Sequence, residues 1–389
     1  MFLRTNRNVG WIGVDIGSHS IKLAQVAATG KRLEVQAAAI VPRVDPWQHD
    51  LSQLQNGISS AGELDVFKQR NSGFSGKQSA ATISMAVCDV RRISMPDQSN
   101  LTFEQLVQNE LASIERFKGV PRQFEYWETE RAFSDTGPPA NVLSVPEFWT
   151  RQCMSDLQSS GLDCQQLDGV PFSLARAFSL FEDSDEPVAL LDWGYSRATM
   201  CIIQNGYPKF VRMLRRSGYR FVMEEIGKGF ELDPEMARIV ASKYGLEDSS
   251  DGWSHSLSRQ EEKRSIQQTL HDFVLEPVNV IAKEVNRTIR FLENQQKALV
   301  PSKLVLFGGG ATLKNVAPLL ESKVRMPAEV WGEDIEVQGP DQLPLAVISN
   351  AIAMSALPFV ESAQQKKGQP ASEVPENSAD SPAAKRVAG

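Results

Sequence analysis

The sequence predicts an α/β fold of two lobes in which one lobe pattern occurs twice. Three features predict it: an apolar hairpin with an Asp-x-Gly bend at residues 11–26, a second such hairpin at 188–203, and a strand at 303–307 that continues through glycines into an amphipathic helix. A pattern that recurs far along the chain is typical of a duplicated unit. The length of 389 residues also exceeds what one hydrophobic core usually holds, so two lobes are expected.

The first hairpin has a bend that is suited to hold a phosphate group. Its flanking runs are rich in β-branched and apolar residues, and the bend has the sequence Asp15-Ile-Gly-Ser-His-Ser20. The glycine is expected to adopt a positive φ, so that backbone N–H groups converge on an anion, while hydroxyls and a lysine add donors and charge. The aspartate would repel a phosphate unless Mg²⁺ or water lies between them. The predicted phosphate-binding residues are Asp15, Gly17, Ser18, Ser20 and Lys22, with Asp15 on Mg²⁺ through water.

The second hairpin repeats the carboxylate, the glycine and the hydroxyls. If the two lobes pair, Asp192 faces Asp15, which favours a role on Mg²⁺ or its waters over the capping of a turn. Gly194 and Ser196 are predicted to contact phosphate from this side. Hydroxyls also favour twisted hairpins that bind nothing, so the role of Ser196 and Thr199 stays open.

The glycine strand is predicted to line the ligand site. Glycines between a strand and a helix let a flat ring or its phosphates lie against backbone and near the helix N-terminus. Trp193 is expected to pack in the core, and His19 is expected to face solvent. The predicted ligand-binding residues of this strand are Gly308, Gly309, Gly310 and Ala311.

Two Asp-x-Gly hairpins followed by a strand with three glycines, in this order, resemble the superfamily of actin, heat-shock chaperones and sugar kinases. The resemblance implies two ribonuclease H-like lobes whose hairpins hold the phosphates of ATP with Mg²⁺, while the glycine strand packs against the adenosine. Lys22 lies where actin has a lysine that contacts phosphate.

A narrower resemblance is to the PilM family of type IV pilus assembly proteins. It is carried by the first hairpin, the strand and turn of the second, the Phe307–Ala311 region, and the segments 87–120 and 168–177. The first segment resembles that family's small inserted α+β subdomain, and the second its linker helix. The chain departs from the family at Ser217-Gly218, where the family has two glycines. Ser217 is expected to crowd the nucleotide, Gly218 still permits its approach, and Glu224 or Glu225, of which we favour Glu225, is the candidate for binding the ribose hydroxyls.

Breaks in the pattern divide the chain. We expect a first lobe at 9–187 with an insert at about 80–140, after which 142–145 returns as a strand of the lobe. A second lobe is expected at 188–360 with a helical subdomain at about 217–300, including a long helix at 261–299 that is interrupted near Pro277. Residues 246–259 are predicted to form a mobile acidic loop, and 361–389 a disordered tail, because both are too polar to bury much surface.

Composition excludes several classes of protein. A net charge of −7 argues against a protein that binds nucleic acid through its overall field. The four cysteines form no Cys-x-x-Cys pair, which favours reduced thiols over disulfides or zinc. No run of eighteen apolar residues occurs. We therefore expect a cytoplasmic protein that reaches a membrane only through partners.

The PilM resemblance implies an ATP-binding scaffold that holds the cytoplasmic N-terminal segment of the inner-membrane protein PilN in a groove beside the insert. It also implies contact with pilus motor ATPases and a position peripheral to the inner membrane, and it leaves self-association open. Slow ATP hydrolysis is the most turnover expected. A filament protein of cell division like FtsA and a small-molecule kinase are the alternatives. A kinase needs a general base for its substrate, and no separate motif supplies one.

Overall fold

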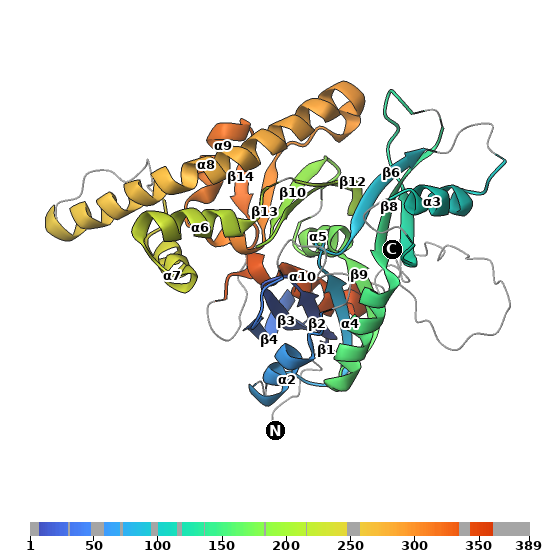
Figure 1. The fold of residues 1–389 in the computed structure, drawn as a ribbon, viewed down its shortest axis with the longest axis horizontal. Coiled ribbons are helices and arrows are strands. Elements are labelled where there is room, and N and C mark those ends of the chain that lie inside the picture. Colours follow the sequence, from blue (N-terminus) through green and yellow to red (C-terminus); the bar gives the residue numbers. More distant parts are fainter. Residues whose placement is uncertain are drawn as a thin grey trace.

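The computed structural model describes residues 8–29, 32–47, 58–70, 73–94, 100–114, 119–135, 137–182, 184–214, 216–246, 257–333 and 343–360. The described part of the chain has two lobes, each built on a mixed sheet, and a third, smaller sheet beside them (Figure 1). The tail expected at 361–389 and most of the loop expected at 246–259 lie outside the described residues.

The sheet of the first lobe has the strand order β4–β3–β2–β5–β9, with the short β1 on β3. β2 pairs antiparallel with β3 and parallel with β5, and β9 continues the parallel part. β2 is buried along its whole length, as expected for a central strand with both faces covered. The bounds are β1 Asn8–Val9, β2 Ile12–Ile16, β3 Ser20–Thr29, β4 Arg32–Pro42, β5 Gln78–Ile83 and β9 Asp163–Gly169.

The second lobe repeats this order and these directions. Its sheet runs β12–β11–β10–β13–β14, antiparallel across the first three strands and parallel across the last three. The predicted duplication is therefore confirmed: β10 corresponds to β2, and the two Asp-x-Gly bends end equivalent strands. The bounds are β10 Val188–Trp193, β11 Ala198–Gln204, β12 Tyr207–Met213, β13 Leu304–Phe307 and β14 Ala328–Val330.

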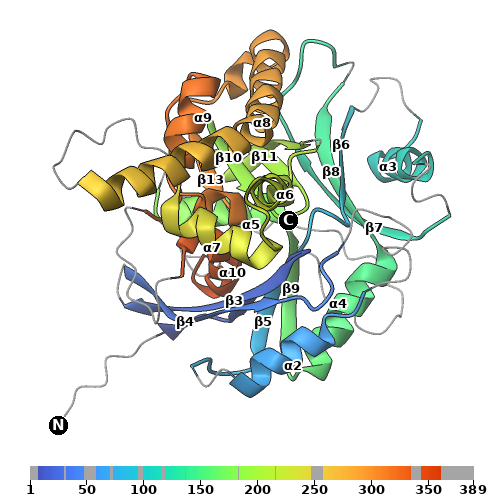
Figure 2. The same cartoon turned by 60° about the vertical axis from the view of Figure 1, so that its left-hand side comes forward.

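Helices cover both faces of the first sheet. Figure 2 shows α2 (Ala61–Arg70) and α4 (Glu147–Ser159) below it, and α5 (Val170–Ser179) and α10 (Leu345–Ser355) above it, toward the second lobe. α10 packs so closely on β2 that a Cβ on Gly13 would stand 1.9 Å from the Ala351 carbonyl oxygen. The Ser173 hydroxyl of α5 donates to Asn350 of α10 at 2.8 Å. A helix from the far end of the described residues therefore completes the first lobe.

The second lobe carries the remaining helices. α6 (Tyr219–Phe230), α7 (Pro234–Tyr244) and α8 (Leu257–Gln295) form the helical layer, and α9 (Val316–Val324) follows the glycine strand. α8 begins earlier than expected and continues through Pro277, so the expected interruption there is wrong. Residues on both sides of this proline, Val274 and Val278, are fully buried in the lobe's core, and this packing keeps the helix continuous. Short 3₁₀ turns occupy Lys297–Leu299 and Gly309–Thr312.

The insert is a three-stranded antiparallel sheet with one helix on it. Its order is β6–β8–β7, and its core joins Ile93, Val107, Leu111 and Val142. The strand expected at 142–145 in the first lobe belongs here, and β5, which lies inside the expected 80–140 range, belongs to the first lobe's sheet. The bounds are β6 Asp89–Ser94, α3 Phe103–Ala112, β7 Arg122–Glu128 and β8 Pro139–Pro146.

The insert also touches the second lobe. The Trp127 indole donates to the Pro208 carbonyl at 2.5 Å, and the Asn141 amide to the Lys209 carbonyl at 3.0 Å. Lys209 is the extra residue of a bulge in β12, whose carbonyl is thereby free of the β11 ladder and available to the insert. The insert therefore bridges both lobes.

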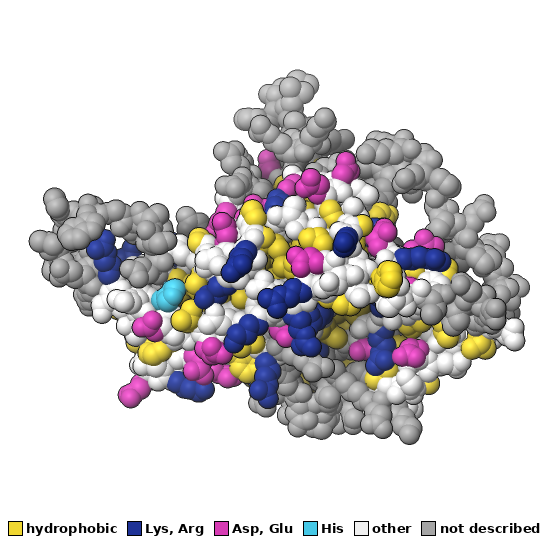
Figure 3. Space-filling view, turned by 90° about the horizontal axis from the view of Figure 1, so that it is seen from above, with side chains coloured by type: hydrophobic (Ala, Val, Ile, Leu, Met, Phe, Trp, Pro, Cys, Tyr) yellow, Lys and Arg dark blue, Asp and Glu magenta, His cyan; other side chains and the backbone are white. Residues whose placement is uncertain are grey.

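The face above α8 carries Lys and Arg side chains close to Asp and Glu side chains, with hydrophobic side chains between them (Figure 3). Among the described residues, no helix has the length and apolar character needed to cross a membrane.

Candidate functional site between the lobes

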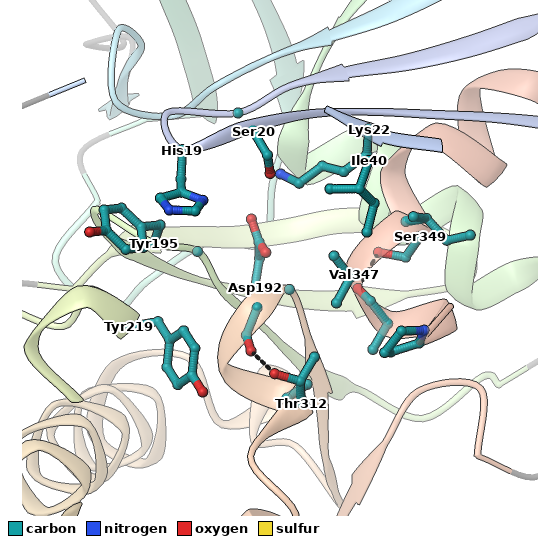
Figure 4. Close-up of a pocket in the computed structure, with 18 of the residues that line it drawn as sticks. His19, Ser20, Lys22, Ile40, Asp192, Tyr195, Tyr219, Thr312, Val347 and Ser349 are labelled. Carbon is teal, nitrogen blue, oxygen red and sulfur yellow. Dashed lines mark hydrogen bonds between the residues drawn. The ribbon is translucent and has the colours of Figure 1, made fainter. Parts of the chain in front are cut away.

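The bends of the two hairpins meet. The Ser18 and Ser196 hydroxyl oxygens are 2.7 Å apart, and the rings of His19 and Tyr195 are in contact, tilted by 39°, with centroids 4.2 Å apart (Figure 4). Ser18 and Ser196 are buried. Two segments from opposite halves of the sequence therefore form one junction between the lobes, as the duplicated pattern predicted.

A cavity of about 1720 Å³ opens beside this junction. It is larger than the several hundred Å³ typical of small-molecule sites, so a nucleoside triphosphate fits within it. It is lined by most of the predicted site residues: Asp15, Gly17, Ser18, Ser20, Lys22, Asp192, Gly194, Ser196, Gly308, Gly309 and Ala311. Gly218, Glu225 and Gly310 are not among its lining residues.

Charged groups of both signs lie at the centre of the cavity. Lys22 Nζ is 3.1 Å from Asp15 Oδ2, because the two residues face each other across the β2–β3 pair. Asp192 points toward Ser20 and Lys22 in Figure 4. Burial, and then repulsion from Asp15, raise the pKa of Asp192 from its ordinary value to about 7, while Lys22 acts in the opposite direction. A bound cation would stabilise the charged forms of Asp15 and Asp192, because it offsets the repulsion between the two carboxylates.

Gly17 is required for space rather than for its backbone angles. Its φ is not positive, so that expectation is wrong. A Cβ at this position would stand 2.5 Å from Lys22 Nζ and 2.7 Å from the Ser20 carbonyl oxygen. The missing side chain therefore lets Lys22 reach Asp15 beneath the bend.

The three glycines of the second lobe have separate roles. Gly308 has φ of +80°, and a Cβ there would stand 2.5 Å from Asp192 Oδ1. Gly310 is buried against the Trp193 ring, which confirms Trp193 as a core residue. Gly309 has open space toward Tyr219. The helix expected directly after these glycines starts later, at Val316, because the 3₁₀ turn intervenes.

The start of α6 supports the second bend from behind. A Cβ on Gly218 would stand 2.5 Å from the Tyr195 carbonyl oxygen, so Gly218 permits close packing of helix on hairpin. The Ser217 hydroxyl accepts from the Ala198 N–H and donates to the Leu214 carbonyl, both at 3.0 Å. Ser217 therefore holds the hairpin instead of crowding the cavity.

Sequence reasoning missed the contribution of α7. Glu235, Arg238 and Ser242 line the cavity from this helix at a spacing that places them on one face. Glu225 pairs with Lys228 on the surface of α6 instead. The i, i+3, i+7 spacing of polar residues in a predicted helix was the available signal, but such spacing is also ordinary on a solvated face.

His19 also differs from expectation, because it lines the cavity and its ring contacts that of Tyr195. Burial, then Lys22 and Arg238, lower the pKa of His19, so its imidazole is mainly neutral at pH 7. No group of three or more His, Cys, Asp or Glu side chains in the described ranges could hold a metal by protein ligands alone. A Mg²⁺ here would need phosphate oxygens and waters beside the two aspartates.

Comparison with solved structures places the chain by fold. A PilM-PilN type IV pilus biogenesis complex matches with a TM-score of 0.66 and 18% identity, over 90% of this chain and 98% of that chain. The ethanolamine utilization protein EutJ from Carboxydothermus hydrogenoformans (TM-score 0.49, 13% identity, 90% and 89% covered) and MreB 5 of Spiroplasma citri bound to AMPPNP (0.49, 10%, 92% and 99%) are more distant. No protein-family model matches the sequence. The chain has the actin-like fold.

Proposed function

We propose that this chain is a cytoplasmic ATP-binding scaffold of type IV pilus or related secretion machinery. Its partner is the cytoplasmic N-terminal segment of a PilN-like inner-membrane protein. The main observation that supports nucleotide binding is that the two Asp-x-Gly bends meet beside a cavity large enough for ATP. The fold likeness to a PilM-PilN complex supports the pilus context.

The phosphates bind at the junction of the bends. Lys22 supplies positive charge, and the hydroxyls of Ser18 and Ser196 exchange their mutual hydrogen bond for bonds to phosphate oxygens. Glu235 of α7 would accept from the ribose hydroxyls, and Gly308 and Gly309 would pack against the base. Glu235 thus replaces Glu225 in the role predicted from the sequence.

Asp15 and Asp192 fit a magnesium ion that keeps its waters. Both line the same cavity from opposite lobes, and burial together with repulsion from Asp15 raises the pKa of Asp192, which a bound cation would offset. Bound Mg²⁺ would neutralise charge on the phosphates and on this carboxylate pair. The residues present therefore suit the ion without supplying a complete set of protein ligands.

Nucleotide in this site acts as a structural ligand that links the lobes. A ligand that contacts both lobes stabilises the state in which they are closed by as much as it prefers that state. Turnover is not needed for this effect, and we assign no general base. Because the insert touches both lobes, lobe closure is communicated to the surface beside it, where the partner segment binds. The partner holds the protein at the inner membrane.

The first test is a thermal-shift measurement with Mg-ATP. Wild-type protein is expected to gain several degrees in Tm, whereas Asp15→Asn and Asp192→Asn lose most of this gain. Glu225→Gln, which changes a carboxylate outside the cavity, keeps it. Sugar phosphorylation or rapid ATP turnover in the same preparation would identify a kinase instead. A normal shift in both aspartate variants would refute the metal assignment.

The second test identifies the partner. Co-purification from cells, with mass spectrometry of the recovered proteins, is expected to yield an inner-membrane protein with a short cytoplasmic leader. Synthetic peptide of that leader should bind purified protein directly. Recovery of cell-division proteins, with no leader-bearing membrane protein, would favour an FtsA-like role and contradict the pilus assignment.

A further inference from the structure

The bend of the first hairpin is held from behind by the segment that follows β4. Its three carbonyl groups each accept a hydrogen bond: Gly17 from Arg43 Nε at 2.8 Å, Ser18 from the Trp47 N–H at 2.7 Å, and His19 from the Arg43 N–H at 2.9 Å. Arg43 and Trp47 do not line the cavity, whereas the bend residues do. These carbonyls are therefore bonded from outside the cavity; the Gly17 N–H donates to the Asp15 carbonyl at 3.2 Å, so an anion would be bound by the N–H groups that follow it in the bend.

The bend of the second hairpin is held in the same way but by different groups. The carbonyls of Gly194 and Tyr195 accept from the N–H groups of Tyr219, at 2.9 Å, and Arg220, at 3.0 Å. These are the first residues of α6, whose N–H groups have no acceptor within the helix. The positive end of the helix dipole thus lies behind this bend.

The two supports occupy equivalent places in the duplicated lobes. Gly17 and Gly194 each follow the bend aspartate by two positions. Each support follows the strand that pairs with the second strand of its hairpin, β4 beside β3 and β12 beside β11. In the second lobe a helix N-terminus supplies the donors and the positive charge. In the first lobe the Arg43 guanidinium supplies the positive charge and the donor to Gly17, while the backbone N–H groups of Arg43 and Trp47 donate to His19 and Ser18.

Arg43 is an unusual residue to bury. Its side chain is 1% exposed, and it is held by the Ser60 hydroxyl at 3.0 Å, by Glu63 at 3.8 Å and by the Trp47 ring at 4.2 Å from its centroid. Burial lowers the pKa of Arg43 to about 10, so the side chain stays charged at neutral pH. Its ion pair with Glu63 is long, at 3.8 Å, and a buried charge held in this way contributes little stability, whereas its Nε bond to the Gly17 carbonyl fixes the bend.

We propose that Arg43 is a positioning residue for phosphate: it fixes the first bend with its N–H groups toward the cavity and places a permanent positive charge behind it. This inference rests on the proposed nucleotide site. It predicts that Arg43 acts on the phosphates of the ligand and not on the nucleoside, since Arg43 reaches the site only through the Gly17 and His19 carbonyls.

The test compares three probes by calorimetry or competition: Mg-ATP, Mg-tripolyphosphate and adenosine. In Arg43→Met, which keeps the apolar stem, we expect at least tenfold weaker binding of both phosphate-bearing probes and unchanged binding of adenosine. Arg43→Lys should show an intermediate loss, because charge remains but the Nε donor to Gly17 is gone. Arg176→Met is the matched control, because it removes a partly buried arginine of α5 that is paired with Asp168 of β9. It should leave the ratio of tripolyphosphate affinity to adenosine affinity unchanged.

Equal weakening of adenosine and tripolyphosphate in Arg43→Met would overturn the proposal, as would unchanged affinity for all three. If Arg43→Met does not fold, Ser60→Ala decides the question, because it removes one bond to Arg43 and keeps the charge. A twofold to threefold loss confined to the phosphate-bearing probes then supports the proposal, and no loss overturns it. Wild-type protein that binds none of the probes would instead refute the proposed function.

Discussion

Ser18 and Ser196, which are 178 positions apart in the chain, share a hydrogen bond of 2.7 Å between their hydroxyl oxygens. It joins the bend that ends β2 to the bend that ends β10, and the neighbouring His19 and Tyr195 rings extend the contact. The lobes therefore meet at their bends, where the proposed phosphates bind. A ligand that inserts there has to replace this bond.

The Ser18–Ser196 bond is expected to couple the lobes only when no ligand is bound. In a double-mutant cycle of Ser18→Ala and Ser196→Ala, the coupling energy from urea denaturation should be about 1 kcal/mol without nucleotide, the usual value of a buried neutral hydrogen bond. With saturating Mg-ATP it should fall toward zero, because each hydroxyl then bonds phosphate. Strict additivity without ligand would show that the contact does not stabilise the closed lobes.

Asp192 should make the ligand-free protein less stable as pH rises. Its pKa in the folded protein is about 7 and its ordinary value is 3.8, so the folded state binds the proton more tightly. The stability that this provides is present below about pH 4 and is lost as pH rises through about 7.

Denaturation of wild type and Asp192→Asn from pH 4 to pH 8 measures this effect, because other titrating groups cancel in the comparison. The full shift corresponds to about 4 kcal/mol, and water in the cavity reduces it, so we expect the asparagine variant to gain about 1–2 kcal/mol relative to wild type over this range. Parallel stability curves would contradict the raised pKa.

Glu235, rather than Glu225, should affect nucleotide affinity. Both glutamates have exposed side chains paired with a basic residue of their own helix, Glu225 with Lys228 and Glu235 with Arg238, but of these two pairs only Glu235 and Arg238 line the cavity. Glu235→Gln is expected to weaken Mg-ATP binding by up to about tenfold, the scale of one charge-assisted hydrogen bond at a partly exposed site. Glu225→Gln should bind like wild type in the same titration. The reverse order would restore the original sequence prediction.

Neighbouring glycines should differ sharply in their tolerance of alanine. A Cβ on Gly310 would stand 2.2 Å from the Trp193 ring, which is fully buried, whereas one on Gly309 would meet only Tyr219 at 3.6 Å. Gly310→Ala is therefore expected to lose about 3 kcal/mol in unfolding free energy, as overpacked core positions do, and Gly309→Ala less than about 1 kcal/mol. Equal losses in urea denaturation would mean that the glycine strand is not packed on Trp193.

The sequence was most informative where a pattern is local. The two hairpins, the glycine strand and the helices α6 and α7 follow from alternation, turn residues and caps within a few positions of each other. The aspartate bends could be recognised because their spacing and residue types repeat along the chain. The net charge and the positions of the cysteines can be read from the sequence alone, and the structure has all four cysteines buried.

Only the tertiary structure decided which of the candidate residues share a cavity. The sequence favoured Glu225, and the way α6 and α7 pack decides that Glu235 lines the cavity instead. The insert's strand β8 and the continuity of α8 through Pro277 likewise depend on partners distant in the chain. The support of the first bend by Arg43 was invisible for the same reason: a hydrogen bond to a backbone carbonyl leaves no residue-type signature, since every residue has that carbonyl.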